Sequence, residues 1–121
     1  MRVHAAYTQR LGPTELITYG QVDVADAASD DVVISTKAVA LNPVDTYIRS
    51  GRFDTRVSFP LILGRDVVGV VEQAPADSGL RPGQRVWANT MGFDGRQGSF
   101  ATAVVAHRNR VYPLPQQVDP L

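Results

Sequence analysis

The polar side chains best suited to chemistry in this sequence lie between residues 42 and 51. Asn42, Asp45, Tyr47 and Arg49 place an amide, a carboxylate, a phenol and a guanidinium within one ten-residue segment. Asn42 and Tyr47 can hydrogen-bond a carbonyl oxygen without titrating near neutral pH. The segment lies at an expected strand-to-helix junction, where side chains often face a cleft. One interpretation is therefore a site that polarises a carbonyl group.

A purely structural role explains the same residues equally well. Asp45 can cap a short helix that begins after Asn42, and Arg49 can pair with Asp45 from one turn further along. The residue types alone leave both interpretations open.

Other catalytic patterns find little support. Gly92, Gly95 and Gly98 recur every third residue, whereas a dinucleotide fingerprint needs Gly-x-Gly-x-x-Gly between a strand and a helix. Here a strand is expected to follow instead. Neither Gly-x-x-x-x-Gly-Lys-Ser/Thr nor Gly-x-Ser-x-Gly occurs. We therefore expect no nucleotide site and no acyl-transfer nucleophile within this chain.

A metal site is not expected either. The 121 residues include no Cys, which excludes a disulfide scaffold and thiol chemistry. The two His residues, His4 and His107, lie far apart, and a zinc site would need both of them together with carboxylates. We predict that His107 is a strand residue with an ordinary hydrogen bond.

Charge and composition limit the partners. Twelve basic and twelve acidic side chains give a net charge of zero, which removes the electrostatic case for binding nucleic acid or an anionic membrane. A hydrophobic fraction of 44% suits one globular domain. No stretch approaches the roughly 18 apolar residues of a membrane span, and the start does not resemble a signal peptide. We therefore expect a cytoplasmic protein.

The charges are unevenly distributed along the chain. Residues 11–36 contain five acids and no base, whereas residues 81–110 contain five Arg and one Asp. This asymmetry indicates either a solvated surface with two differently charged sides or a docking face for another domain.

Short Val-rich runs separated by Gly and Pro predict a mainly β domain that positions these residues. Expected strands cover residues 3–8, 16–22, 31–41, 66–74, 85–89 and 100–107, and a seventh begins at 111. Gly69 interrupts one strand, which indicates a bulge or a close backbone approach. We predict a partly closed antiparallel β-barrel.

One or two short helices are expected, one of them after Asn42. Pro43 suits a first helical turn, and Val44, Tyr47 and Ile48 share one face. Ser50-Gly51 ends the helix.

The motif at residues 42–51 (NPVDTYIRSG) resembles the signature of the zinc-free quinone oxidoreductases, the zeta-crystallin group of the medium-chain dehydrogenase/reductase superfamily. The similarity continues in the family's order through residues 59–72 (FPLILGRDVVGVVE), 82–87 (PGQRVW), 98–101 (GSFA) and 112–115 (YPLP). It spans nearly the whole chain.

The resemblance implies that residues 1–121 are the GroES-like N-terminal, substrate-side domain of a two-domain enzyme. The family's second part is a Rossmann domain that binds NADPH, expected downstream and absent from this chain. The implied reaction is hydride transfer to a small-molecule quinone or α,β-unsaturated carbonyl. The chain alone is expected to be inactive, and the full-length enzyme could form a homodimer.

By resemblance, Asn42 and Tyr47 are catalytic and lie close to both the nicotinamide and the acceptor ring. Asp45 and Arg49 match the signature and are expected to support substrate binding. Phe53 stands where many relatives carry Tyr, so a hydroxyl contact to the substrate is lost at that position.

The resemblance also implies chemistry without zinc. Zinc alcohol dehydrogenases, the sister group, carry a catalytic Cys in place of Asn42 and Gly-His-Glu in place of Gly64-Arg65-Asp66. Protein hydrogen bonds would then polarise the acceptor oxygen. The alternative function is a stand-alone GroES-like binding or assembly domain without catalytic activity.

Overall fold

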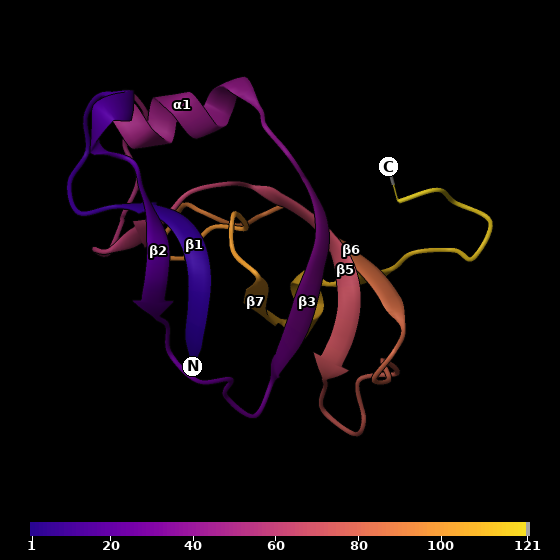
Figure 1. The fold of residues 1–121 in the computed structure, drawn as a ribbon. Coiled ribbons are helices and arrows are strands. Elements are labelled where there is room, and N and C mark those ends of the chain that lie inside the picture. The colour runs from indigo at the N-terminus through magenta and orange to yellow at the C-terminus, as the bar shows by residue number, and fades with distance from the viewer. Residues whose placement is uncertain (121) are drawn as a thin grey trace.

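The computed structural model describes residues 1–120; residue 121, the last of the expected domain, lies outside the described residues. The strands form two antiparallel sheets (Figure 1). One sheet has the order β2-β1-β4 and comprises β1 (Arg2–Thr8), β2 (Thr18–Asp23) and β4 (Leu61–Ile62). The other has the order β7-β3-β5-β6-β8 and comprises β3 (Asp31–Ala40), β5 (Asp66–Gln73), β6 (Arg85–Ala88), β7 (Ala103–His107) and β8 (Tyr112–Pro113). The expected mainly β class is confirmed.

The two sheets are joined along one side without closing into a complete barrel. Ala5 of β1 forms an isolated bridge with Ala101. Beside it, the Ala6 N–H donates to the Phe100 carbonyl oxygen at 2.9 Å. The Thr102 N–H donates to the His4 carbonyl oxygen, also at 2.9 Å. This arrangement agrees with the expected partly closed architecture.

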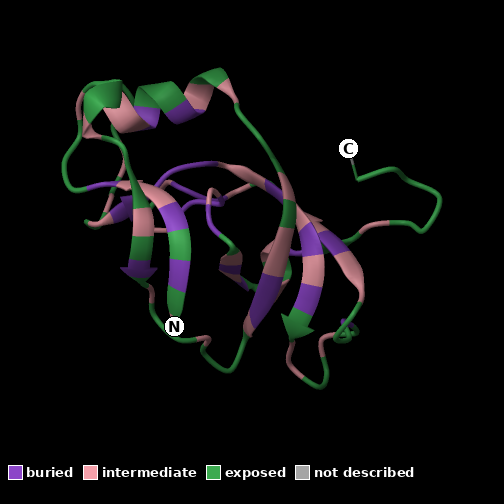
Figure 2. Ribbon diagram, in the orientation of Figure 1, coloured by how far each residue is buried: buried purple, intermediate pink, exposed green. Residues whose placement is uncertain are grey.

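Buried and more exposed residues alternate along several strands (Figure 2). In β5, Val67 and Val71 are buried while Glu72 and Gln73 are exposed. The main cluster is completed by buried residues of the neighbouring strands and loops, among them Val32, Ile34, Val86, Met91, Val104 and Val111. This core includes Val67, which directly follows Asp66 of the candidate site.

The strand expected at residues 16–22 begins later than predicted. Residues Thr14–Leu16 form a short 3-10 helix, in which the Leu16 N–H donates to the Pro13 carbonyl oxygen at 3.1 Å. The turn that follows Pro13 therefore uses the backbone groups that a strand would have paired, and β2 starts at Thr18.

The strand expected at residues 100–107 also starts later, at Ala103. Residues 98–102 connect the sheets instead: the Gly98 N–H donates to the Ile62 carbonyl oxygen at 2.8 Å and the Phe100 N–H to the Leu63 carbonyl oxygen at 2.9 Å. The strand β4, whose Ile62 supplies one of these carbonyl oxygens, is only two residues long and is too short to be predicted from an apolar pattern.

The helix α1 spans Pro43–Ser50, as predicted, and lies across the ends of β1 and β2 (Figure 1). Pro43 occupies its first turn, and Gly51 ends it with a φ of 85°, a left-handed conformation that suits glycine. Ile48 anchors the helix on Leu61 and Leu63. A second 3-10 helix covers Arg108–Arg110. No helix among residues 1–120 has the length and apolar character needed to cross a membrane.

Gly69 marks the expected irregularity in β5. Thr36 pairs with Gly69 and Ala38 with Val68, so β3 carries one extra residue at this point. A Cβ atom on Gly69 would overlap the Ser35 carbonyl oxygen and Ile34 Cγ2. The close backbone approach predicted from the sequence is confirmed.

We expect Gly69→Ala to lower the free energy of unfolding by roughly 2 kcal/mol or more, because the added methyl group fits only if neighbouring backbone atoms move. Urea unfolding measures this change. The matched control is Gly20→Ala in β2, where a Cβ atom would lie 4.0 Å from Tyr7 and fits without movement. Equal losses in the two variants would contradict the close approach.

Candidate functional site

The candidate site begins where β3 ends and α1 starts. The Asn42 side chain reaches across to β5, and its Nδ2 donates to Asp66 Oδ2 at 2.7 Å. The backbone N–H of Asn42 donates separately to Asp45 Oδ2 at 2.8 Å, which caps the helix. Residue 42 thus uses its main chain for the helix and its side chain for the site.

Asp45 is buried, with 5% of its surface exposed, and its carboxylate is occupied by the cap. Burial raises the pKa of this carboxyl above its ordinary value. The hydrogen bond from Asn42 lowers the pKa, the negative charge of Asp66 raises it further, and the positive charge of Arg65 lowers it. The expected capping role of Asp45 is confirmed, and its burial favours a supporting role over direct substrate contact.

Arg49 faces away from the junction. Its Nη1 donates to the Gly12 carbonyl oxygen at 2.7 Å, and its own carbonyl oxygen accepts from the Gly12 N–H at 2.8 Å. The ion pair between Arg49 and Asp45 that the helical spacing suggested is wrong, because the longer reach to Gly12 satisfies the guanidinium. Arg49 therefore ties α1 to the loop after β1.

Tyr47 and Phe53 present exposed rings on the other side of the helix. Their exposed fractions are 43% and 44%, large for aromatic residues. The Phe53 N–H donates to the Tyr47 carbonyl oxygen at 3.2 Å, which holds the loop against the helix end. Among residues 1–120 the Tyr47 hydroxyl makes no hydrogen bond, so it remains able to donate to a ligand.

A chain of contacts leads from these rings back to Asp66. Phe53 meets Phe93 edge to face, with the ring centroids 6.4 Å apart. The guanidinium carbon of Arg65 lies 4.5 Å from the centroid of Phe93, and Arg65 directly precedes Asp66. We call the set Asn42, Tyr47, Phe53, Arg65 and Asp66 the junction surface.

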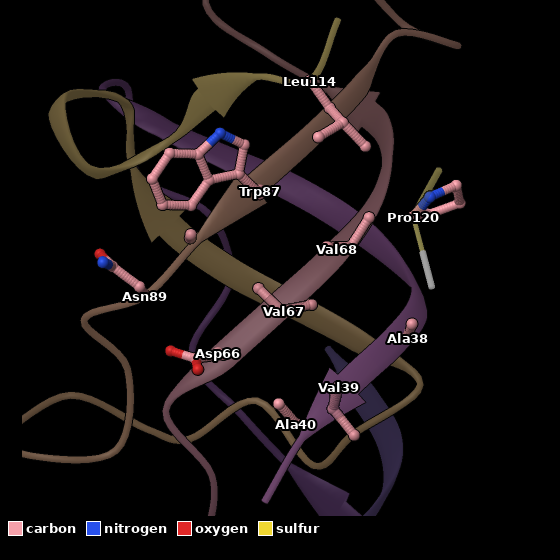
Figure 3. Close-up of a pocket in the computed structure, with 11 residues that line it drawn as sticks. Ala38, Val39, Ala40, Asp66, Val67, Val68, Trp87, Asn89, Leu114 and Pro120 are labelled. Carbon is pink, nitrogen blue, oxygen red and sulfur yellow. The ribbon is translucent and has the colours of Figure 1, made fainter. Parts of the chain in front are cut away.

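Through Asp66, the junction surface reaches a pocket of about 590 Å³ on the sheet (Figure 3). Asp66 lies at the edge of this pocket near Asn89, and Pro120 lies on the other side. Most of the lining is apolar and comes from the ends of three strands, with Val39, Val68 and Trp87 among its members. The Asn42–Asp66 pair is therefore next to a concave apolar surface, the usual setting of a small-molecule site.

The described residues do not fit a zinc ion. Residues 1–120 contain no group of three or more His, Cys, Asp and Glu side chains arranged to hold a metal. At the junction the donors are an amide already bonded to a carboxylate, with an arginine beside them. His107 ends β7, and its Nδ1 accepts from the Asn109 N–H at 3.1 Å, the ordinary hydrogen bond that we predicted.

The described residues fit only part of a dinucleotide. The one α-helix of residues 1–120 follows Asn42, without the glycine turn that cradles a pyrophosphate. Gly92, Gly95 and Gly98 lie in a loop between strands, as the spacing indicated. The exposed rings and amide of the junction surface suit the nicotinamide end of a cofactor, whereas its phosphates need another surface.

Asp66, Arg65 and Phe93 extend the site beyond the residues predicted from the sequence. Asp66 and Arg65 carried a signal, since they replace the Glu and His of the zinc enzymes' Gly-His-Glu motif. Phe93 carried none, because only the fold brings residue 93 next to residue 53.

Comparisons with known proteins agree with this architecture. The alcohol dehydrogenase GroES-like domain family matches residues 28–116, and the chain belongs to this family. The sequence is 34% identical over 109 residues to a quinone oxidoreductase of Rattus norvegicus, covering 89% of this chain and 32% of that protein. It is 36% identical over 96 residues to a trans-enoyl reductase of Aspergillus flavipes, covering 74% of this chain and 28% of that protein.

A solved structure supports the same conclusion. The quinone oxidoreductase of Pseudomonas syringae pv. Tomato DC3000 superposes with a TM-score of 0.85 at 26% identity, covering 99% of this chain and 35% of that one. The chain spans about a third of the length of the curated relatives it matches. The resemblance to quinone oxidoreductases expected from the motifs is confirmed.

The raised pKa of Asp45 generates a prediction for Asp45→Asn, which keeps an oxygen that can accept from the Asn42 N–H. Because the folded pKa exceeds the unfolded value, protonation favours the folded wild type, and this contribution is lost as pH rises through the folded pKa. The melting temperature of Asp45→Asn minus that of the wild type should therefore be most positive near pH 7 and fall toward pH 4.

Asp45→Ala is the comparison variant, since it removes the cap acceptor itself. It should be less stable than Asp45→Asn by about 1 kcal/mol at every pH, because neither variant titrates at residue 45. A difference between Asp45→Asn and the wild type that does not change with pH would contradict the role of burial.

Proposed function

We propose that this chain is the acceptor-binding domain of an NADPH-dependent oxidoreductase that reduces a quinone or an α,β-unsaturated carbonyl without a metal ion. The observation that carries the proposal is the Asn42–Asp66 hydrogen bond. It orients an amide, in place of a metal ligand, on a carboxylate that lines an apolar pocket. The similarity to quinone oxidoreductases supports the same reaction.

Bound NADPH would supply the hydride, and the residues of this chain would manage the charge that the hydride creates. The acceptor oxygen becomes negative as reduction proceeds, so a fixed donor stabilises the transition state more than the ground state. Asn42 has a second amide hydrogen after bonding Asp66, and Tyr47 has a free hydroxyl. Both can donate to that oxygen.

Asp66 and Phe53 have indirect parts in this proposal. The Asp66 carboxylate accepts only, so it fixes which end of the Asn42 amide carries the donors. Phe53 presents an exposed ring against which a planar acceptor can stack. Exclusion of water would be completed by the surface that binds the cofactor's phosphates.

The second candidate function is a binding or assembly domain without chemistry. Among residues 1–120, no glycine turn precedes the α-helix α1. This absence favours a binding or assembly role for the chain by itself. The two functions differ in whether the protein containing this chain consumes NADPH.

The chain of 121 residues by itself should not bind NADPH with micromolar affinity or reduce quinones, because it lacks a pyrophosphate cradle. Calorimetric titration and absorbance at the reduced-nicotinamide band measure the two properties. Micromolar NADPH binding by this chain would contradict the proposed division of labour.

In the protein that joins this chain to a nucleotide-binding domain, Asn42→Ala or Tyr47→Phe should lower kcat/KM for quinones and enones by roughly 5- to 50-fold. Asp66→Ala should have a similar effect, and the double variant Asn42→Ala with Asp66→Ala should lose little more than either alone. Steady-state kinetics with several acceptors provide the measurement.

Two controls separate catalysis from folding. Asn42→Ala retains the backbone N–H that bonds Asp45 but removes the side-chain bond to Asp66, so its melting temperature is measured beside kcat/KM to separate lost stability from lost activity. Tyr47→Phe keeps the exposed ring and removes only the hydroxyl. If Tyr47→Phe changes kcat/KM by less than twofold at an unchanged melting temperature, Tyr47 has no part in the reaction.

A further inference from the structure

Three guanidinium groups gather beside the junction surface. The guanidinium carbons of Arg65 and Arg96 lie 4.5 Å and 4.6 Å from the ring centroid of Phe93. Arg110 supplies the third, and Thr90 connects it to Arg96. The Thr90 carbonyl oxygen accepts from Arg96 Nε at 2.7 Å, and its hydroxyl oxygen accepts from Arg110 Nη1 at 3.5 Å. We call Arg65, Arg96 and Arg110 the arginine cluster.

The protein compensates little of this positive charge. Asp94 is the one carboxylate of residues 1–120 that forms an ion pair with the cluster, 3.5 Å from Arg96 Nη1. It is 62% exposed and is shared with Arg56, 3.7 Å away, so its effect is weak. Within the same residues, Arg65 and Arg110 take part in no ion pair.

The like charges of the cluster act on the pKa of Arg96. Burial lowers the pKa of Arg96, and the positive charge of Arg110 lowers it further. Only 22% of the Arg96 side chain is exposed. Arg65 and Arg110 have no ion pair among residues 1–120, and an added anion would reduce the repulsion between the three like charges.

The position of the arginine cluster connects it to the acceptor. Phe93, which contacts Arg65 and Arg96, meets the exposed ring of Phe53 edge to face. Arg65 is also the residue before Asp66, which orients Asn42. An acceptor ring stacked on Phe53 would therefore have positive charge one ring away.

We propose that the arginine cluster binds a carboxylate carried by the acceptor, so that the site prefers anionic quinones or enones to neutral ones. The planar guanidinium fork matches the two oxygens of a carboxylate. Arg65 and Arg110, which have no internal ion pair, supply the donors, while Arg96 fixes the positions of Phe93 and Thr90. This specificity rests on the proposed function.

The test uses binding to this chain rather than turnover. Benzoate and benzamide are planar rings of similar shape that differ in charge. At constant ionic strength, benzoate should shift the amide NMR signals of residues 65 and 90–96 and bind at least tenfold more tightly than benzamide. Arg65→Gln and Arg110→Gln should each weaken benzoate binding by about three- to tenfold.

Arg81→Gln is the matched control, because Arg81 is an exposed arginine of the same basic segment outside the cluster. It should leave benzoate binding unchanged. Equal binding of benzoate and benzamide, or equal losses in Arg81→Gln and Arg110→Gln, would overturn the proposal. If Arg65→Gln fails to fold, Arg110→Gln and the benzamide comparison still decide.

The outcome separates this proposal from the proposed function. Charge-selective binding that depends on Arg110 would support the carboxylate site even if no quinone is reduced. Loss of that selectivity would leave the roles of Asn42 and Tyr47 in reduction untouched.

Discussion

The antiparallel pairing of β3 with β5 brings Asn42 next to Asp66, the contact at the centre of the candidate site. Ala40 pairs with Asp66, so the last residue of β3 lies beside the first residue of β5. The chain leaves β3 at Asn42 and finds the Asp66 carboxylate within one hydrogen bond. A shift of this register by one residue would turn Asp66 to the other face and disconnect the helix from the sheet. The extra residue opposite Gly69 belongs to this same pairing.

The junction combines groups with opposing electrostatic preferences. Asp45 is buried and disfavours ionisation, whereas Asp66, at the edge of the pocket, is available to bond the Asn42 amide. Arg65 lies close enough to act on Asp45 while its guanidinium contacts Phe93. Two consecutive residues at the start of β5, Arg65 just before the strand and Asp66 as its first residue, therefore supply a positive charge and an orienting carboxylate to adjoining parts of the surface.

Much of this architecture follows from local sequence. The boundaries of α1 come from Pro43 and Gly51, whose conformational restrictions act within the segment itself. The partner of the Arg49 guanidinium could not be derived in this way. Gly12 is distant in sequence, and its carbonyl oxygen competes with the neighbouring Asp45 for the guanidinium. The place of Phe93 in the site could not be predicted from the sequence either, since Phe53 is brought next to it only by tertiary packing. Local chemistry thus identified the helix and its cap, and long-range contacts decided which side chains join the junction surface.

The division of labour at residue 42 has an evolutionary consequence. Asp45 caps the helix through the main-chain N–H of residue 42, which every amino acid except proline provides. The bond between this N–H and Asp45 therefore does not depend on which side chain stands at residue 42. A lineage could exchange a metal-binding cysteine for an amide here, or the reverse, while inheriting the same helix start. Diversification of chemistry at this junction would then depend on the partner available at residue 66, rather than on rebuilding the scaffold.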